Sequence, residues 1–551
     1  MPATDGPTSS PPLVRFLLSL TPFLFGLSIL WLGQDVSWDL RNYHFYNPFA
    51  FLTGRMGYDV AVSHVATYYN PLMYIPFYHA VSWLPPKAMG FLLGFIPGLN
   101  VLPIYGIARR VVDLGDSGKT AWFCLGLTLT AVLGMINLAE IGTSYADNIL
   151  SLPVLTAVWL IVRFREAICA SARSGWPVAA AAGLLAGSAL GLKLPFAVYC
   201  VGICAAFFGL DAPFWRRFAM AFVFGLGVLA GTALTGGFWL LEMWQRFQNP
   251  LFPYFNEVFK SPWGAIGSYR DERFLPKNLA MWLLFPFWFN VDPAQVGEVG
   301  FRDLRFPLLY TLLLVLLVCT LRRRFGKSVD RGAHSGGAGD RATTRFFIVF
   351  MVVSFLLWMK MFAVYRYAVV CEFMAPLTIF LVLGALLRNP RRQVRAALAA
   401  MVFLIVTLDP GHWGRRPWTS DYFDVNLPSL AGEPNAIVLV TGHDPVAYMI
   451  PFFPPQARFL RIQGFVTGPS TSLNETDRLM MRALAEHRGP TLVLYRDYEE
   501  WHALNALEFY GLQLDRSSCQ SFAPGIEPQP EHPFFLCRVT PRTAQREGNA
   551  S

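Results

Sequence analysis

Charged residues are scarce in this chain. Asp, Glu, Lys and Arg make up 15% of its 551 residues, whereas 54% of the residues are hydrophobic. An ordinary soluble domain carries about a quarter charged residues. The net charge of +9 does not indicate nucleic-acid binding, because the arginines fall in short clusters between apolar runs. We therefore expect a protein of the lipid bilayer and exclude nucleic acid as a partner.

Cysteine is sparse as well, and its placement excludes the common zinc motifs. The eight cysteines form no CxxC pair and no Cys/His spacing typical of a zinc site. Only Cys519 and Cys537 lie in a polar tail, where a disulfide between them would suit an extracytoplasmic compartment. A phosphate loop is also lacking, because Asp113 stands where the similar segment 115–120 needs its first glycine.

Long apolar runs alternate with basic clusters along residues 1–408. The first run is long enough to cross a bilayer, and no small-residue cleavage site follows it, so we expect a membrane anchor and not a signal peptide. The arginine clusters all fall on one side, which the positive-inside rule assigns to the cytoplasm. The pattern predicts about eleven spans, with the N-terminus inside and the C-terminus outside. They are expected at 13–33, 86–107, 121–138, 149–163, 177–192, 194–210, 218–241, 304–321, 346–363, 367–387 and 396–408.

Two domains follow from this pattern. Residues 1–408 are expected to form a mainly α-helical transmembrane bundle with a large outward loop at 34–85 and a polar cytoplasmic loop at 322–345. Residues 409–551 are expected to form a small soluble extracytoplasmic α/β domain. Its strands are expected at 436–441 and 491–495, and its helices at 474–487 and 499–510. The Gly442-His-Asp444 segment after the first strand is interpreted as a plain turn.

The first outward loop carries many groups capable of chemistry. Asp35 and Asp39 are four residues apart, with Arg41 and His44 nearby. Behind them, the aromatic and proline-broken segment 70–84 predicts a helix lying in the membrane interface. The alternative interpretation of Asp39 is a cap at the start of a short helix.

Charged residues also fall in four later outward loops. Asp147 begins a predicted span, and the alternative for it is again a helix cap. Lys193 lies in a tight hairpin, Arg270 in the next loop, and Lys360 and Arg366 in the last one. A single basic residue in such a place can simply extend to the interface. Acidic and basic groups from five loops are therefore expected at the outer face.

The order of short motifs in the first loop resembles that of a known superfamily. The motifs are DLRNY at 39–43, FLTGRMGY at 51–58, YNPL at 69–72 and WLPP at 83–86. This order is similar to the first loop of the GT-C membrane glycosyltransferases, and most similar to the family 87, polyprenyl-phosphate-mannose-dependent type. The chain departs from that pattern in having Asn70-Pro71 where a double proline is usual. The resemblance covers roughly residues 13–110, and the remaining spans only in layout.

The resemblance implies an inverting transfer of a sugar from a polyprenyl-phosphate carrier to a glycan, lipid or protein acceptor at the outer face of the membrane. Asp39 would act as the general base that takes the proton of the acceptor hydroxyl. Asp35 is its closest competitor, and Asp147 is a second candidate or a partner that orients the acceptor. No cofactor is implied, although Asp35 and Asp39 could share a divalent cation.

The leaving group of such a reaction is a phosphate ester, which needs charge stabilisation and no proton. Cationic groups in a water-poor site provide that stabilisation. The candidate substrate-binding residues are Arg41, His44, Lys193, Arg270, Lys360 and Arg366.

Two other classes of protein are the alternatives. A transporter or flippase predicts charged residues deep within the spans and an internal repeat, and the sequence shows neither clearly. A polymerase or ligase of lipid-linked oligosaccharides uses a diphosphate-linked glycan and tends to carry its large outward loop later in the chain. The composition, rich in Ala, Arg and Gly, is typical of a bacterial protein, so we expect a multi-pass protein of the inner membrane.

Overall fold

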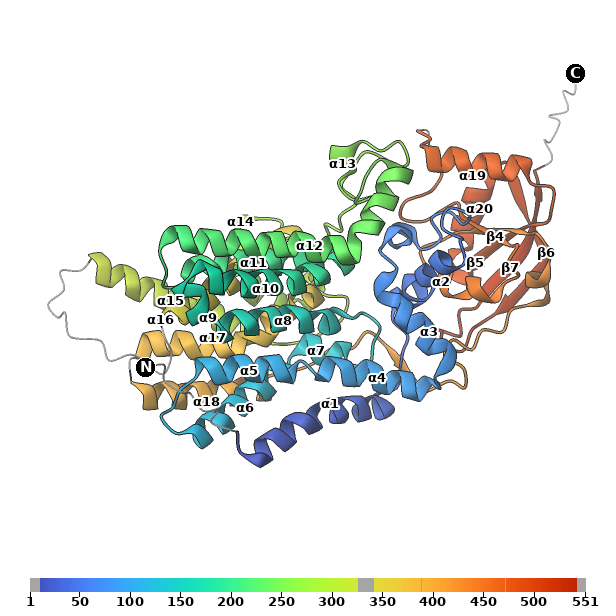
Figure 1. Ribbon diagram of the computed structural model, residues 1–551. Coiled ribbons are helices and arrows are strands. Elements are labelled where there is room, and N and C mark those ends of the chain that lie inside the picture. The colour runs from blue at the N-terminus through green and yellow to red at the C-terminus, as the bar shows by residue number, and fades with distance from the viewer. Residues whose placement is uncertain (1–9, 326–340, 388, 471, 543–551) are drawn as a thin grey trace, which may run out of the picture. The chain divides into compact units, whose positions relative to one another are not determined.

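The computed structural model describes residues 10–325, 341–387, 389–470 and 472–542. By its internal contacts the chain divides into two compact units. We call the first the helical unit (1–32, 90–238 and 271–413) and the second the sheet unit (33–89, 239–270 and 414–551). The first outward loop and the C-terminal tail therefore fold within the same unit. Figure 1 shows the elements with their labels.

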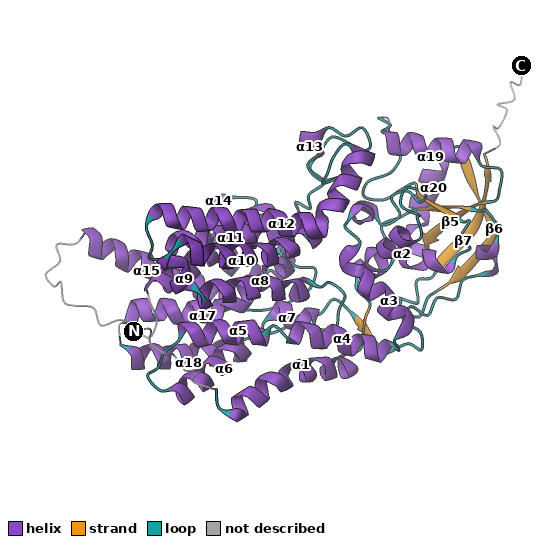
Figure 2. Ribbon diagram, viewed as in Figure 1, coloured by secondary structure: helices purple, strands orange, loops and turns teal. Residues whose placement is uncertain are grey.

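The helical unit consists mainly of helices, which Figure 2 draws in purple. Seven helices among the described residues are long and apolar enough to cross a membrane. They lie at Pro12–Leu32, Pro86–Val111, Arg173–Leu192, Phe214–Phe247, Arg305–Arg323, Arg341–Met361 and Tyr365–Leu387. The chain is mainly helical, as predicted. The count of eleven spans stays a prediction, because four expected spans form helices of 16 residues (α6, Ser117–Val132), 17 residues (α8, Asp147–Arg163, and α18, Pro390–Val406) or 10 residues (α11, Ala197–Ala206). The orientation of the spans also stays a prediction.

Several helices of this unit begin at side chains that satisfy their first backbone N–H groups. Asp116, Ser171, Asn278 and Asn389 cap α6, α10, α14 and α18 in this way. The helices are α1 (Pro12–Leu32), α4 (Pro86–Gly98), α5 (Val101–Val111), α6 (Ser117–Val132), α7 (Met135–Glu140), α8 (Asp147–Arg163), α9 (Arg165–Ala170), α10 (Ala172–Leu192), α11 (Ala197–Ala206), α12 (Phe214–Phe247), α14 (Leu279–Val291), α15 (Arg305–Phe325), α16 (Arg341–Met361), α17 (Val369–Leu387) and α18 (Pro390–Val406). Helices α4 and α12 continue into the sheet unit. Within the expected loop 322–345, residues 326–340 lie outside the described residues.

Helices α10 and α12 approach each other closely through glycines. A Cβ atom on Gly183 would lie 2.1 Å from the carbonyl oxygen of Phe224, and one on Gly187 would lie 2.1 Å from that of Val228. Small residues at such contacts let the backbones of membrane helices pack directly. A larger residue at either position would have to push the two helices apart.

The sheet unit is centred on a five-stranded sheet of order β4-β3-β5-β7-β6 (Figure 1). Strand β3 pairs in parallel with β4 and β5, and β7 is antiparallel to both β5 and β6. Strand β3 is buried along its whole length, as expected for a parallel strand covered on both faces. The elements of this unit are β1 (Gln34–Asp35), α2 (Tyr46–Leu52), α3 (Ile75–Trp83), α13 (Asn256–Phe259), β2 (Arg415–Arg416), β3 (Ile437–Val440), β4 (Arg458–Arg461), α19 (Glu475–Glu486), β5 (Thr491–Arg496), α20 (Glu500–Phe509), β6 (Leu512–Phe522) and β7 (Phe534–Pro541).

The elements predicted for the tail are confirmed. Strands β3 and β5 and helices α19 and α20 lie where the sequence places them. Asn474 and Asp477 form a reciprocal capping box at the start of α19. The disulfide between Cys519 and Cys537 is present and joins β6 to β7. The helix expected within 70–84 is also present as α3, and its place in a membrane interface stays a prediction.

Two distant stretches of sequence build the sheet unit together. Val60 of the first loop lies beside β4, where its N–H donates to the carbonyl of Phe459 at 2.9 Å. Arg55 forms a buried ion pair of 2.7 Å with Asp59. The same guanidinium donates to the carbonyl of Ala457 at 2.6 Å. These contacts fix residues 55–60 against the strand that precedes α19.

Candidate functional site

Three candidate residues from separate predicted outward loops meet in the helical unit. Asp147 is the first residue of α8, Lys193 follows the last residue of α10, and Arg366 lies just before α17. Nζ of Lys193 lies 2.6 Å from Oδ1 of Asp147, and Nη1 of Arg366 lies 3.7 Å from Oδ2. One carboxylate thus faces two cations at the ends of three helices.

The Asp147 side chain does not cap its helix. Ala146 occupies the N-cap position, with a left-handed φ of 62° and no side-chain cap hydrogen bond. The backbone N–H of Asn148 donates instead to Oε2 of Glu140 at 3.1 Å. Asp147 and Glu140 are both 0% exposed. The interpretation of Asp147 as a helix cap is therefore wrong, and its carboxylate is available to the two cations.

Aromatic rings surround the two cations. The Arg366 guanidinium lies over the ring of Tyr145 at 4.4 Å and over that of Tyr367 at 4.9 Å. Nζ of Lys193 lies 5.3 Å from the centre of the Tyr367 ring. Cation–π attraction of this kind is stronger where water is excluded. Arg366 is buried among these groups within its unit, so simple extension to a surface does not describe it.

Glu140, which the sequence did not single out, adds a second carboxyl group. Burial and the nearby Asp147 carboxylate raise the pKa of Glu140 well above its ordinary value, although Lys193 and Arg366 act against that shift. A carboxyl group that keeps its proton leaves the two cations opposed by Asp147 alone. The cluster then carries excess positive charge, which suits a bound anion.

A second buried ionic network holds the short helix that ends in Glu140. Glu372 accepts hydrogen bonds from two backbone N–H groups in the first turn of α7, at 2.8 and 3.1 Å. Asp303 accepts a third, at 3.1 Å, and forms a 2.9 Å ion pair with the buried Arg305. Carboxylates at a helix N-terminus are favourable because the helix dipole is positive there. This network therefore fixes α7 and the position of Glu140.

The remaining basic candidates lie at surfaces. Lys360 is exposed in the last turn of α16. Arg270 is exposed in the sheet unit, at the end of the segment 239–270. Of the four basic residues proposed for the leaving phosphate in the later loops, the structure brings Lys193 and Arg366 together.

The two acids of the first loop lie in the sheet unit and have different surroundings. Asp35 is 1% exposed, and its Oδ1 accepts the backbone N–H of Ser37 at 2.9 Å. Asp39 is 8% exposed and precedes a π-helical turn that it does not cap, so its interpretation as a cap is wrong. The Tyr43 hydroxyl donates to Oδ2 of Asp39 at 3.4 Å.

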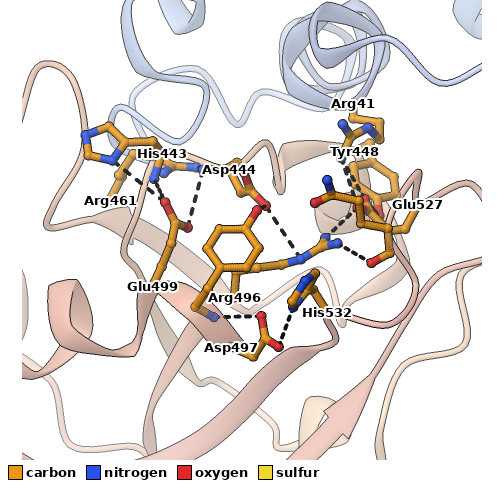
Figure 3. Close-up of polar contacts among 12 residues, drawn as sticks. Arg41, His443, Asp444, Tyr448, Arg461, Arg496, Asp497, Glu499, Glu527 and His532 are labelled. Carbon is orange, nitrogen blue, oxygen red and sulfur yellow. Dashed lines mark hydrogen bonds and ion pairs between the residues drawn. The ribbon is translucent and has the colours of Figure 1, made fainter. Parts of the chain in front are cut away.

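Arg41 and His44 make contacts inside the sheet unit. Nη1 of Arg41 donates to both oxygens of Glu527, at 3.0 and 2.9 Å. Glu527 also accepts from Arg496 at 2.5 Å and from the Tyr448 hydroxyl at 2.7 Å (Figure 3). His44 is 0% exposed and stacks on a neighbouring tyrosine at 4.1 Å. The contact between Arg41 and Glu527 joins the first loop to the tail, whereas His44 packs on Tyr74 within the loop.

The described residues also contain a group of side chains that could hold a metal ion. It consists of His443, Glu499 and His502 in the sheet unit. It does not include Asp35 or Asp39, the pair considered for a cation from the sequence. Residues 443 and 499 lie far apart in the chain, which is why no spacing motif marked the group.

No protein-family model, curated protein or solved structure matches the chain. The likeness of the first loop to GT-C enzymes therefore stays a resemblance. The chemistry of the residues that the structure brings together is therefore the basis for inferring a function.

Proposed function

We propose that this protein is a membrane glycosyltransferase that moves a sugar from a polyprenyl-phosphate carrier to an acceptor at the outer face of the membrane, with inversion. The observation that supports this most is the buried cluster of Asp147, Lys193 and Arg366 in a unit rich in membrane-length helices. A polyprenyl carrier keeps its chain in lipid and presents a phosphate at the membrane face. An enzyme for it needs cations at the ends of spans, where a charge costs less than in mid-bilayer.

Lys193 and Arg366 are assigned to the donor phosphate. Negative charge grows on the leaving phosphate as the bond to the sugar breaks, and fixed cations in a water-poor site stabilise that charge strongly. Asp147 holds the two cations in place, because each of its oxygens faces one of them. We therefore assign Asp147 a positioning role toward the two cations, in place of the role of second candidate base or acceptor-orienting partner that the sequence suggests.

The acceptor hydroxyl needs a base, and Asp39 stays our prediction for that role. Asp35 holds the backbone N–H of Ser37, which ties its carboxylate to the local turn. Asp39 accepts the Tyr43 hydroxyl at 3.4 Å and stands at the start of the turn that begins at Leu40. A carboxylate base is worth typically 10²–10⁴-fold in rate, so Asp39→Asn is expected to lose activity by that order, and Asp35→Asn less.

The test uses the full-length protein in detergent. The lipid-linked sugar that accumulates in a deletion strain identifies the donor, which is then supplied in radiolabelled form with membranes as the source of acceptor. Lys193→Gln and Arg366→Gln are each expected to lower kcat by about 10²–10³. The matched control is Arg163→Gln, an exposed basic residue at the other end of α8. Wild-type turnover in the Lys193 and Arg366 variants contradicts the proposal, and a diphosphate-linked donor supports the polymerase or ligase alternative.

A transporter or flippase is the second candidate, and one observation favours it. Glu372 is 0% exposed and lies within the candidate span Tyr365–Leu387, a placement typical of transport pathways. The sequence alone shows no charged residue clearly deep within a span. The hydrogen bonds from α7 to Glu372 favour a structural role instead. Translocation of a fluorescent polyprenyl phosphate across reconstituted vesicles without sugar transfer would support this second candidate.

A further inference from the structure

We propose that the sheet unit binds a divalent transition-metal ion, with Zn²⁺ as the best fit, through His443, Glu499 and His502. Each residue offers one ligand atom, and these atoms all lie within 4.8 Å of one another. Two imidazoles and one carboxylate form the donor set of zinc sites that keep a coordination position open for water or a substrate. The proposal rests on the sheet unit alone and is independent of sugar transfer.

The position of the group in the sheet supports a binding site. Strand β3 lies between β4 and β5, and all three are parallel. The chain forms β3 first, then β4 on one side and β5 on the other, so the strand order reverses between β3 and β5. In open α/β sheets, ligands bind outside the carboxyl ends of the strands at such a switch point. His443 follows the end of β3, and Glu499 follows the end of β5.

The local geometry brings the three ligands together. Glu499 ends a 3-10 turn, and His502 lies in the first turn of α20, three residues later. Glu499 is the N-cap residue of α20, directly before the turn that carries His502. A Glu-x-x-His spacing also supplies ligands in metal-binding helix bundles. Nδ1 of His443 lies 3.7 Å from Oε1 of Glu499. The rings of His443 and His502 lie 5.0 Å apart.

The backbone orients the Glu499 carboxylate. Its oxygens accept the N–H groups of His443 at 2.6 Å and Asp444 at 3.4 Å (Figure 3). Contacts of this kind orient metal ligands and raise their affinity. Gly442 has a φ of 88°, and a Cβ atom there would lie 2.0 Å from Oε2 of Glu499. Only glycine therefore permits this approach of the carboxylate to the turn.

Two arginines, Arg461 and Arg496, lie close to the proposed metal site. Arg461 donates to the carbonyls of Gly442 at 2.6 Å and Asp444 at 3.3 Å, from beneath the turn. Nε of Arg496 lies 3.6 Å from the Asp444 carboxylate. Arg496 also donates to Glu527 at 2.5 Å, so it is shared between two carboxylates. Because Arg461 already interacts with the carboxylates of Glu499 and Asp444, a dication needs the neutral imidazoles as its main ligands. The ligand atoms around a zinc ion lie about 3.3 Å apart. Rotation of the part-exposed imidazole rings therefore has to bring their ligand nitrogen atoms closer by about 1–1.5 Å.

The test measures metal binding and not activity. The full-length protein in detergent is stripped with a chelator and titrated with Zn²⁺ by calorimetry and with Co²⁺ by visible absorption. We expect uptake of about one ion per chain, as three ligands around a single metal require. His443→Ala and His502→Ala are each expected to weaken binding by more than about 100-fold, since even outer-shell contacts are worth 10–100-fold. Glu499→Gln removes the charge but keeps an oxygen for the backbone N–H groups, and it is expected to weaken binding as well.

The matched control is His532→Ala in the same unit. His532 pairs with Asp497 at 2.9 Å and is outside the proposed ligand set. Its variant is expected to bind Zn²⁺ like the wild type. Equal binding by the His443/His502 double variant, or no uptake of either ion by the folded wild type, overturns the proposal. Melting curves without metal show whether each variant is folded. Sugar transfer is measured in a separate assay. A negative result for zinc binding therefore does not bear on the proposed transferase activity, and a negative result for sugar transfer does not bear on the zinc site.

Discussion

Lys193 and Asp147 form a buried ion pair between the end of α10 and the start of α8. Nζ of Lys193 lies 2.6 Å from Oδ1 of Asp147, and the two side chains are 11% and 0% exposed. Each charge depends on the other because water is excluded from both. A buried pair whose one partner is removed leaves an uncompensated charge, which is strongly destabilising.

Asp147→Asn is therefore expected to destabilise the purified protein by about 3–5 kcal/mol. Lys193→Met removes the charge that needs the carboxylate, and the double variant is expected to be more stable than the sum of the two single losses predicts. Unfolding in mixed micelles with increasing SDS measures all three variants in one cycle. Strictly additive losses would show that the two side chains do not interact.

Glu140 is expected to make phosphate binding pH-dependent. Its pKa in the folded protein is raised above the ordinary 4.5 by burial and by Asp147. The protonated form is therefore favoured in the folded state, and the stability that it contributes is lost as pH rises through the raised pKa. Ionised Glu140 also adds a negative charge beside Lys193 and Arg366, so affinity for an anion falls over the same pH range.

Glu140→Gln is the matched variant, because its amide stays neutral while its oxygen can still accept the N–H of Asn148. We expect the affinity of this variant for polyprenyl monophosphate, measured by fluorescence quenching in detergent, to rise as the phosphate takes its second negative charge near pH 6. The wild type should gain less affinity than the variant over the pH range in which Glu140 loses its proton. Identical pH profiles for the two proteins would contradict the role of Glu140.

The secondary structure of the sheet unit could be predicted because its signals are local. Strands 436–441 and 491–495 are short apolar runs, and α19 begins at an Asn and Asp pair with capping-box spacing. The grouping of the first loop with the tail could not be predicted in this way. The pairing of Val60 with β4 joins residues four hundred positions apart, and no periodicity in either segment records it.

The same distinction holds for the candidate site residues: local signals could name them, but not show which of them meet. Asp147, Lys193 and Arg366 could be named because each stands at the end of an apolar run, but their convergence depends on how α8, α10 and α17 pack. Arg41 was named for its place in a polar loop, and its partner Glu527 lies in the tail. His443 and Glu499 were missed because their contact exists only after β3 and β5 pair.

Gly187→Leu is expected to disrupt the packing of α10 against α12. A Cβ atom at Gly187 would lie 2.1 Å from the carbonyl oxygen of Val228, which belongs to the helix backbone and cannot rotate away. The loss is expected to exceed the 1–3 kcal/mol of ordinary overpacking. Gly225→Leu is the control, because nothing lies within 4 Å of a Cβ atom there. Resistance to SDS unfolding measures both, and equal losses would contradict the close contact.

Glu527 is expected to hold the first loop to the tail within the sheet unit. Its buried carboxylate accepts from Arg41, Arg496 and Tyr448. Glu527→Gln leaves Arg41 buried without a carboxylate, and we expect a loss of about 3–5 kcal/mol and faster proteolysis of the segment 33–89. The control is Glu508→Gln, whose exposed pair with Arg542 contributes only about 0–1 kcal/mol. Equal melting temperatures for the two variants would show that the buried network does not carry this stability. A selective loss of stability in Glu527→Gln would show that the Arg41–Glu527 pair stabilises the sheet unit. An Arg41 variant that loses sugar transfer would then need a measurement of its folding before Arg41 is assigned to substrate binding.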